Sequence, residues 1–252
     1  MNSQSIAPRH HNQSLKTNLA LFALFFATMA WGASFYLVKV ATLEVGIFSF
    51  LVWRFGLAVA LLALAFPKKV FKVSAPCLQG GWVLGTLLFA TLVAQTVGLQ
   101  YTTAGKSGFI TVLYVPMTPL AAWIFLKQRP TWRQALVAAI AVSGLYVLTL
   151  QGDNRVNLGQ WWHEINRGDL WTVLAAWLAA LHIIYTEKFT RLNSDSIALG
   201  LWQFFFCFCA LGVVGLFWNP TGGHNVWNLF QWSKMSLFLL IFNAVVTTCF
   251  AF

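Results

Sequence analysis

The sequence predicts an all-α fold, a polytopic helical membrane protein built from two related halves. Of its residues, 59% are hydrophobic and only 9% are charged, whereas a soluble domain is usually about 25% charged. Apolar runs long enough to cross a bilayer recur along the whole chain. A repeat is also visible, because four residues recur 149 positions later: Lys39 as Lys188, Trp53 as Trp202, Phe55 as Phe204 and Leu62 as Leu211. A shared offset across two apolar runs and the loop between them indicates an internal duplication.

The basic balance of the chain has a simple explanation. A net charge of +10 and a pI near 9.8 would also fit a nucleic-acid-binding protein. The basic residues, however, are scattered between the apolar runs rather than gathered on one polar face. We therefore attribute the charge to loops at the membrane surface and expect no nucleic-acid partner.

The first apolar run, Leu19–Lys39, has the length of a membrane anchor. About 20 helical residues cover about 30 Å, which matches the hydrocarbon core. A secretory signal peptide is the competing interpretation, but its apolar region spans only about 7–15 residues, and further apolar runs follow. The same length criterion predicts seven more spans: Gly46–Phe66, Gly80–Leu99, Ser107–Leu126, Gln134–Leu150, Leu170–Glu187, Ser196–Trp218 and Met235–Phe252.

The distribution of loop charge predicts the orientation. Lys and Arg gather in cytoplasmic loops of membrane proteins. Ten of them lie before the first span and in every second loop after it, namely Arg9, Lys16, Lys68, Lys69, Lys72, Lys127, Arg129, Arg133, Lys188 and Arg191. The alternate loops hold four: Lys106, Arg155, Arg167 and Lys234. We expect a cytoplasmic N-terminus.

These elements divide the chain into four parts. Residues 1–18 form a polar tail, 19–150 a first repeat of five spans, 151–169 an external linker, and 170–252 a second repeat with three spans. Because five is odd, the second repeat enters the membrane with the opposite orientation. Transporters with such inverted repeats place the substrate site between the halves. Two full repeats would have ten spans, so the sequence predicts eight of ten, with the second repeat truncated.

Arg54 is the first candidate for a substrate site. It lies about eight residues inside its predicted span, where a charge costs about 2.5–3.5 kcal/mol. No Asp or Glu lies in the interior of any predicted span. Arg54 must therefore face an anionic solute, a polar cavity or backbone carbonyls, and the last of these would make it a structural residue.

Other candidates are uncharged or aromatic. His182 lies in the sixth predicted span and could titrate near neutral pH; a packing histidine with a hydrogen bond is the alternative. Gln95 and Gln203 could bind solute or bridge helices. Four aromatic residues could line an apolar cavity or simply face lipid and core: Trp31, Trp53, Tyr114 and Trp202. Lys39 is expected to extend to the headgroups, where Glu44 is a candidate salt-bridge partner.

Two prolines, Pro116 and Pro119, predict a helix break in the fourth span. Each removes a backbone donor and kinks or unwinds the helix. Broken helices line binding sites in transporters, although an ordinary kink is the alternative.

The sequence shows no catalytic or cofactor motif. The segment GLQYTTAGKS resembles a phosphate-binding loop, but Gln100 stands where the first glycine is required. HEINR, which begins at His163, lacks the second histidine of a zinc protease motif. Cys207 and Cys209 are two apart on a helix, so their side chains diverge. We expect no enzyme activity, cofactor or metal.

Several segments carry a family resemblance. They are AWGASFYLVKVA, WRFGLAVALLAL, LQYTTAGKSGFITVLYVPMTPLAAWIFLKQRPT, SGLYVL and AALHIIYTEKF. From Leu19 to the C-terminus, the chain resembles the EamA family of the drug/metabolite transporter superfamily. The long central block is the most specific part, although family members usually have a glutamate where this chain reads LKQRPT. The resemblance implies ten helices around a central cavity, alternating access, and a bacterial inner membrane.

Two functional hypotheses remain at this point. The first is a permease that moves a small metabolite, amino-acid-like or another organic solute, out of the cell through a cavity between the repeats. The second is a transport-inactive truncated remnant, or a subunit that another chain completes. The expected partners are a small solute and the lipid bilayer, and a homodimer is left open.

Overall fold

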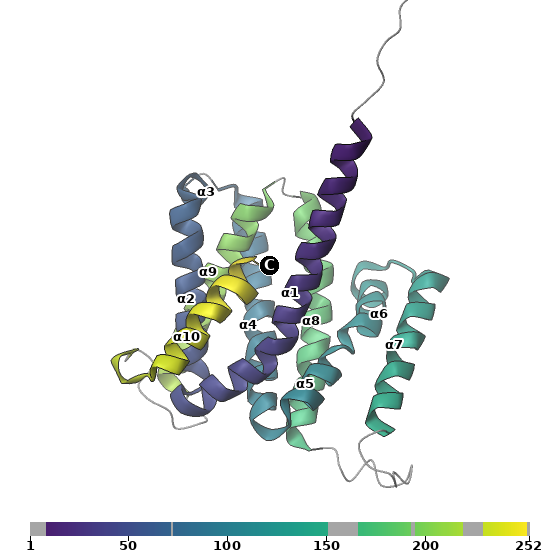
Figure 1. The fold of residues 1–252 in the computed structure, drawn as a ribbon. Coiled ribbons are helices and arrows are strands. Elements are labelled where there is room, and N and C mark those ends of the chain that lie inside the picture. The colour runs from purple at the N-terminus through teal and green to yellow at the C-terminus, as the bar shows by residue number, and fades with distance from the viewer. Residues whose placement is uncertain (1–8, 72, 151–165, 193–194, 219–228, 251–252) are drawn as a thin grey trace, which may run out of the picture.

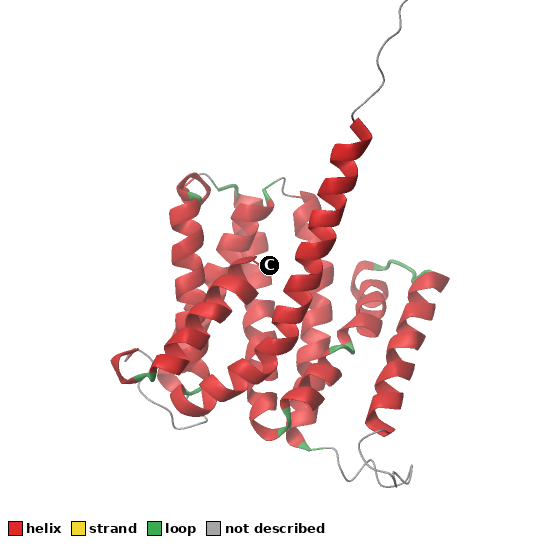
Figure 2. Cartoon of the chain, viewed as in Figure 1, coloured by secondary structure: helices red, strands yellow, loops and turns green. Residues whose placement is uncertain are grey.

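A computed structural model describes residues 9–71, 73–150, 166–192, 195–218 and 229–250 of the chain. All regular structure within these ranges is helical (Figures 1 and 2). The longer helices are α1 (Arg9–Val45), α2 (Ile47–Ala65), α4 (Ala75–Tyr101), α6 (Tyr114–Leu126), α7 (Trp132–Leu150), α8 (Arg167–Leu192) and α9 (Ser196–Phe217). The shorter ones are α3 (Pro67–Phe71), α5 (Ala104–Thr111), η2 (Leu229–Gln231), α10 (Lys234–Phe242) and the π-helical η3 (Asn243–Phe250).

Six helical segments of the described chain are long and apolar enough to cross a membrane. They are Leu21–Val45, Ile47–Ala65, Ala75–Tyr101, Ala104–Leu126, Arg167–Leu192 and Ser196–Phe217. The other two predicted spans correspond to helices as well, α7 and the pair α10–η3, but neither is among the six. The all-helical membrane architecture is therefore confirmed, whereas the total of eight spans stays a prediction.

The helices extend beyond the predicted apolar runs. The first begins at Arg9, inside the segment interpreted as a tail, and α8 begins at Arg167, inside the predicted linker; residues 1–8 and 151–165 lie outside the described ranges. Hydrophobicity marks only the lipid-embedded part of a helix, and its polar end turns continue into the headgroup region. As a result Glu44 and Asp169 lie in end turns of spanning helices, and Glu187 lies in the polar C-terminal part of α8.

The chain reverses between α1 and α2 at a single residue, Gly46. Its φ of 85° lies in the region that only glycine adopts without steric cost. This tight reversal starts α2 directly beside the end of α1.

The fourth predicted span is interrupted at Val112 and Leu113, between α5 and α6. Pro116 has no N–H for the Val112 carbonyl, and the Val115 N–H bonds to that carbonyl instead at 2.9 Å. Val112 and Leu113 likewise donate three residues back, to Phe109 and Ile110. Such tighter bonds are typical of a helix that is broken near a proline.

The core lies where α2, α4 and α9 meet. Its largest fully buried side chains include Phe48, Phe50, Phe55 and Phe204. α4 approaches α9 very closely, since a Cβ added at Gly85 would lie 2.7 Å from the Gln203 carbonyl oxygen. Glycine permits this contact between backbones. By contrast α7 contacts α6 at the side of the bundle and leaves much of its apolar surface exposed (Figure 1).

Candidate functional site

Arg54 lies near the middle of α2 and is buried, with 9% of the residue exposed. Its Nε donates to the Thr248 Oγ1 at 2.8 Å, and one terminal nitrogen donates to the Thr247 Oγ1 at 3.0 Å. The guanidinium also lies 5.6 Å from the centroid of the Phe55 ring. Two hydroxyls and an aromatic face thus surround the cation that the sequence left without a partner.

The π-helical turn η3 explains why two adjacent threonines can serve one arginine. The hydroxyls of Thr247 and Thr248 both donate to the Asn243 carbonyl, at 2.8 and 3.0 Å. Thr248 is five residues from Asn243, a separation that the wider π turn brings into range. With its hydrogen directed at that carbonyl, each hydroxyl has lone pairs left to accept from Arg54.

Trp31 connects α1 to the same cluster. Its indole N–H donates to the Thr247 carbonyl at 3.1 Å, while 42% of the side chain remains exposed. The Arg54 cluster, defined as Trp31, Arg54, Asn243, Thr247 and Thr248, therefore joins α1 and α2 of the first predicted repeat to η3 of the second.

His182 and Gln203 form a second buried polar contact, between α8 and α9. The His182 Nε2 and the Gln203 Oε1 are 3.2 Å apart, so the imidazole N–H faces an acceptor. The neighbouring Trp202 ring meets the Phe205 ring edge to face and the Phe206 ring at a tilt of 40°. Its indole nitrogen is buried with no hydrogen-bond partner in the described part of the chain.

The remaining candidates lie near the α5–α6 break or at the edge of the core. The Gln95 amide donates to the Thr111 hydroxyl at 3.4 Å, at the last residue of α5. Tyr114 and Pro116 are half-buried in the first turn of α6, where Tyr114 packs on the cluster around Ala180 and Ile184. Trp53 is half-buried beside the main core. The structure thus distributes the sequence candidates over several places instead of bringing them together in one site.

An ion pair at each end of the bundle connects the first predicted repeat to the later helices α8 and α9. At the end where α3 lies, Lys69 pairs with Asp195. The Lys69 hydrogen bond lowers the pKa of this carboxyl from its usual range, and the N–H of Ala198 adds to the effect. At the opposite end the Lys106 ammonium lies 2.6 Å from the buried carboxylate of Asp169, which also accepts from Thr102.

The expectation that the Lys39 side chain extends to the headgroups is wrong. The Lys39 amine donates to the Thr102 carbonyl at 2.5 Å instead, so it fastens α1 to the α4–α5 corner. Glu44, which the same end of α1 presents, accepts from Ser233 and Ser236 at the start of α10.

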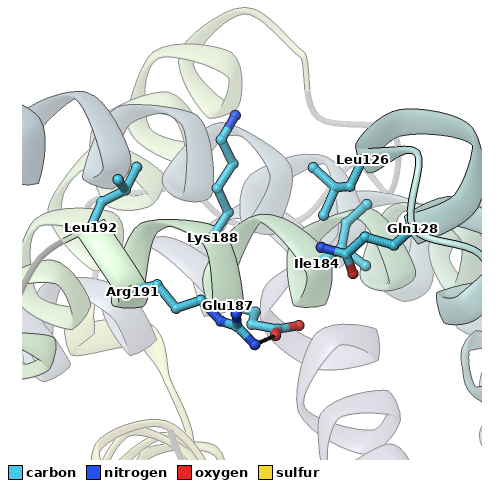
Figure 3. Close-up of a pocket in the computed structure, with 7 residues that line it drawn as sticks. All are labelled: Leu126, Gln128, Ile184, Glu187, Lys188, Arg191 and Leu192. Carbon is cyan, nitrogen blue, oxygen red and sulfur yellow. Dashed lines mark hydrogen bonds and ion pairs between the residues drawn. The ribbon is translucent and has the colours of Figure 1, made fainter.

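Two surface hollows lie beside α6. One, of about 310 Å³, lies between α6 and α8 and is lined by Leu126, Gln128, Ile184, Glu187, Lys188, Arg191 and Leu192 (Figure 3). The other, of about 200 Å³, lies between α6 and α7 and is lined by Val115, Pro119, Arg133, Gln134 and Val137. Pro119 is the one sequence candidate that lines either hollow.

Sequence reasoning missed the acceptors of Arg54 and both ion pairs. The sequence signal for the acceptors of Arg54 was the segment NAVVTTCF, in which the hydroxyls of Thr247 and Thr248 follow Asn243 by about one helical turn. The partners Asp169 and Asp195 lay outside the predicted interior of the spans. Within the described residues, no group of three or more His, Cys, Asp or Glu side chains could hold a metal ion.

Residues 18–150, more than half of the chain, match the model of the EamA-like transporter family. The chain belongs to this family. Membership, together with the six apolar helices of the described residues, supports a multi-pass membrane protein.

Two curated relatives of this EamA chain carry transporter names. An uncharacterized transporter of Archaeoglobus fulgidus is 29% identical over 197 residues, which cover 78% of this chain and 58% of the relative. A protein of Streptantibioticus cattleyicolor named "Probable terminal-alkyne amino-acid exporter" is 27% identical over 164 residues, which cover 64% and 52%. The chain thus matches little more than half the length of these relatives.

A solved crystal structure shares the fold. It superposes with a TM-score of 0.63 at 15% sequence identity, over 93% of this chain and 77% of the other. At this identity the likeness concerns the fold alone.

Proposed function

We propose that this EamA-family protein exports a small organic solute with an amino-acid-like carboxylate, by alternating access between two inverted repeats. We place it in a bacterial inner membrane with a cytoplasmic N-terminus. The family membership supports a transporter of small solutes, and the exporter name of one relative supports the solute class. The loop charge described above supports the orientation.

The packing of α2 and α9 supports the inverted repeat. Phe55 and Phe204 are equivalent by the 149-residue offset, and their rings meet edge to face with centroids 5.5 Å apart. Equivalent positions of two twofold-related halves meet only near the axis. In addition α4 contacts α8 and α9, and its counterpart α10–η3 contacts α1 and α2, as such an axis requires.

The Arg54 cluster is the single structural observation on which we base the proposal of a carboxylate-bearing solute. Arg54 donates to two neutral hydroxyls, whereas a carboxylate would add the attraction of an opposite charge and could accept two parallel N–H bonds at once. A carboxylate that enters the central region can therefore displace Thr247 and Thr248 from Arg54. Because these threonines belong to the other predicted half, the exchange would loosen one contact between the halves and couple binding to their movement.

Transport by the purified chain in proteoliposomes tests this proposal. We expect Arg54→Ala to lower kcat/KM for a transported amino acid about 10- to 100-fold, since a hydrogen bond to a charged group contributes about 1.5–3 kcal/mol. Lys234→Ala, which removes an exposed cation remote from the cluster, should transport normally. The carboxamide of the same amino acid should compete poorly with the wild-type protein.

Two results would contradict the assignment. Normal transport by Arg54→Ala would remove Arg54 from the site, and equal competition by the carboxamide would remove the carboxylate. The second hypothesis, a remnant or subunit that needs another chain, predicts no transport by the 252-residue wild type alone and recovery only when that other chain is added.

A further inference from the structure

The larger surface hollow, which we name the α6–α8 groove, is lined by seven residues with contrasting chemistry (Figure 3). Leu126, Ile184 and Leu192 supply hydrocarbon. Lys188 and Gln128 supply a cation and an amide. The groove therefore offers apolar walls beside hydrogen-bond donors.

The charged residues of this groove lie on two adjacent rows of α8. Ile184, Lys188 and Leu192 are spaced by four and share one row of the helix. Glu187 and Arg191 occupy the adjacent row, where they pair at 2.5 Å. In Figure 3 the Lys188 side chain and the Glu187–Arg191 pair extend from opposite sides of α8.

The carboxylate next to Lys188 in the sequence, that of Glu187, already pairs with Arg191. The Lys188 ammonium lies 5.6 Å from the centroid of the Tyr185 ring. Among the described residues, no ion pair involves Lys188. Its side chain is exposed, so it can receive an anion from outside the protein.

The position of the groove along the helices indicates the source of that anion. Leu126 is the last residue of one membrane-length segment and Leu192 the last of another, so the groove lies at the boundary between hydrocarbon and water. Three more cations follow α6 closely: Lys127, Arg129 and Arg133. Clusters of four or more basic residues beside a spanning helix attract anionic lipid headgroups.

We propose that the α6–α8 groove binds an anionic phospholipid of the adjacent leaflet. The phosphate lies beside Lys188 and the Gln128 amide, and the parts of the acyl chains nearest the headgroup lie against Leu126 and Ile184, on the membrane side of Lys188. This site differs from the Arg54 cluster, and its existence does not depend on which solute is transported or on whether the chain transports at all.

Native mass spectrometry of the purified chain in detergent, titrated with phosphatidylglycerol or phosphatidylcholine, tests the proposal. We expect phosphatidylglycerol to bind more tightly than phosphatidylcholine. Lys188→Ala should weaken phosphatidylglycerol binding about fivefold, the effect of one basic residue near an anionic surface, and Lys188→Arg should preserve it. Lys234→Ala removes an exposed cation at the opposite end and should leave binding unchanged.

Gln128→Ala provides a second variant, which should weaken phosphatidylglycerol binding without a change of charge. Circular dichroism of each variant checks that the helices are retained. Equal binding of the two lipids, an unchanged affinity in both Lys188→Ala and Gln128→Ala, or equal losses in Lys188→Ala and Lys234→Ala would overturn the proposal. Displacement by millimolar inorganic phosphate would do so too, because it would indicate a site for free phosphate rather than lipid.

Discussion

At the scale of single residues, Arg54 shows how a bilayer-embedded cation is stabilised without a carboxylate. Its charge is delocalised over a planar group with several donors, and two of those donors bind the Thr247 and Thr248 hydroxyls. Both hydroxyls are held by one carbonyl, that of Asn243. The cluster is therefore a chain of bonds in which each member orients the next.

Replacing Thr248 by Val should destabilise the protein, because it leaves a buried guanidinium N–H without an acceptor. We expect a loss of about 1–3 kcal/mol, visible as a lower Tm in detergent. Thr248→Ser keeps the hydroxyl and should lose much less. In an Arg54→Met background the Thr248→Val change should have little effect, and equal effects in both backgrounds would contradict the contact.

Asp195 gives a residue-level prediction about pH. Its pKa is lowered in the folded protein, first by the Lys69 hydrogen bond. A lowered carboxyl pKa stabilises the fold above the unfolded value, near 3.9, and this contribution disappears as the pH falls through the lower folded value. Because about a third of each side chain is exposed, we expect at most about 1 kcal/mol.

Asp195→Asn isolates that charge, since Asn also caps helices well and the Asp195 side chain caps α9 through the Ala198 N–H. At pH 7 the variant should melt slightly below the wild type, and the difference in Tm should shrink toward pH 3. A difference that grew on acidification would refute this account. Asp195→Ala, which also removes the cap, should cost about 1 kcal/mol more.

At the scale of elements, the departures from regular helix occur where polar groups gather. The α5–α6 break places Thr111 beside Gln95, and the π turn of η3 presents Thr247 and Thr248 to Arg54. The two prolines predicted an interruption of the fourth span because a missing N–H is a local property. No comparable local signal predicted the π turn, whose extra width is useful only because Arg54 lies opposite it.

At the scale of the whole molecule, the two ends of the bundle are fastened by different contacts. Lys69 and Asp195 join α3 to the start of α9, and Lys106 and Asp169 join the α5 corner to α8. Alternating access would require the halves to separate at one end at a time. Both pairs are therefore contacts that a transport cycle would break in turn.

Cysteine accessibility tests the orientation of this bundle. In a protein whose native cysteines are replaced by Ser or Ala, Pro130→Cys should react only from the cytoplasmic side, because the loop after α6 belongs to the strongly basic set. Lys234→Cys, at the start of α10, should react only from outside. An impermeant maleimide on intact cells and on inverted vesicles distinguishes the two, and labelling of both positions from one side would refute the proposed topology.

The sequence by itself determined that the protein lies in a lipid bilayer and that its fold is helical. Low charge and recurring apolar runs exclude a water-exposed surface, and backbone groups in lipid must bond within their own segment, so helices are required. The 149-residue offset and the family motifs are likewise properties of the chain alone. Tertiary structure decided which polar groups meet: Arg54 with two threonines almost 200 positions away, Lys39 with a carbonyl, and His182 with Gln203. Such pairings depend on how helices distant in sequence pack together, and the hydrophobic pattern that locates each helix does not encode its neighbours.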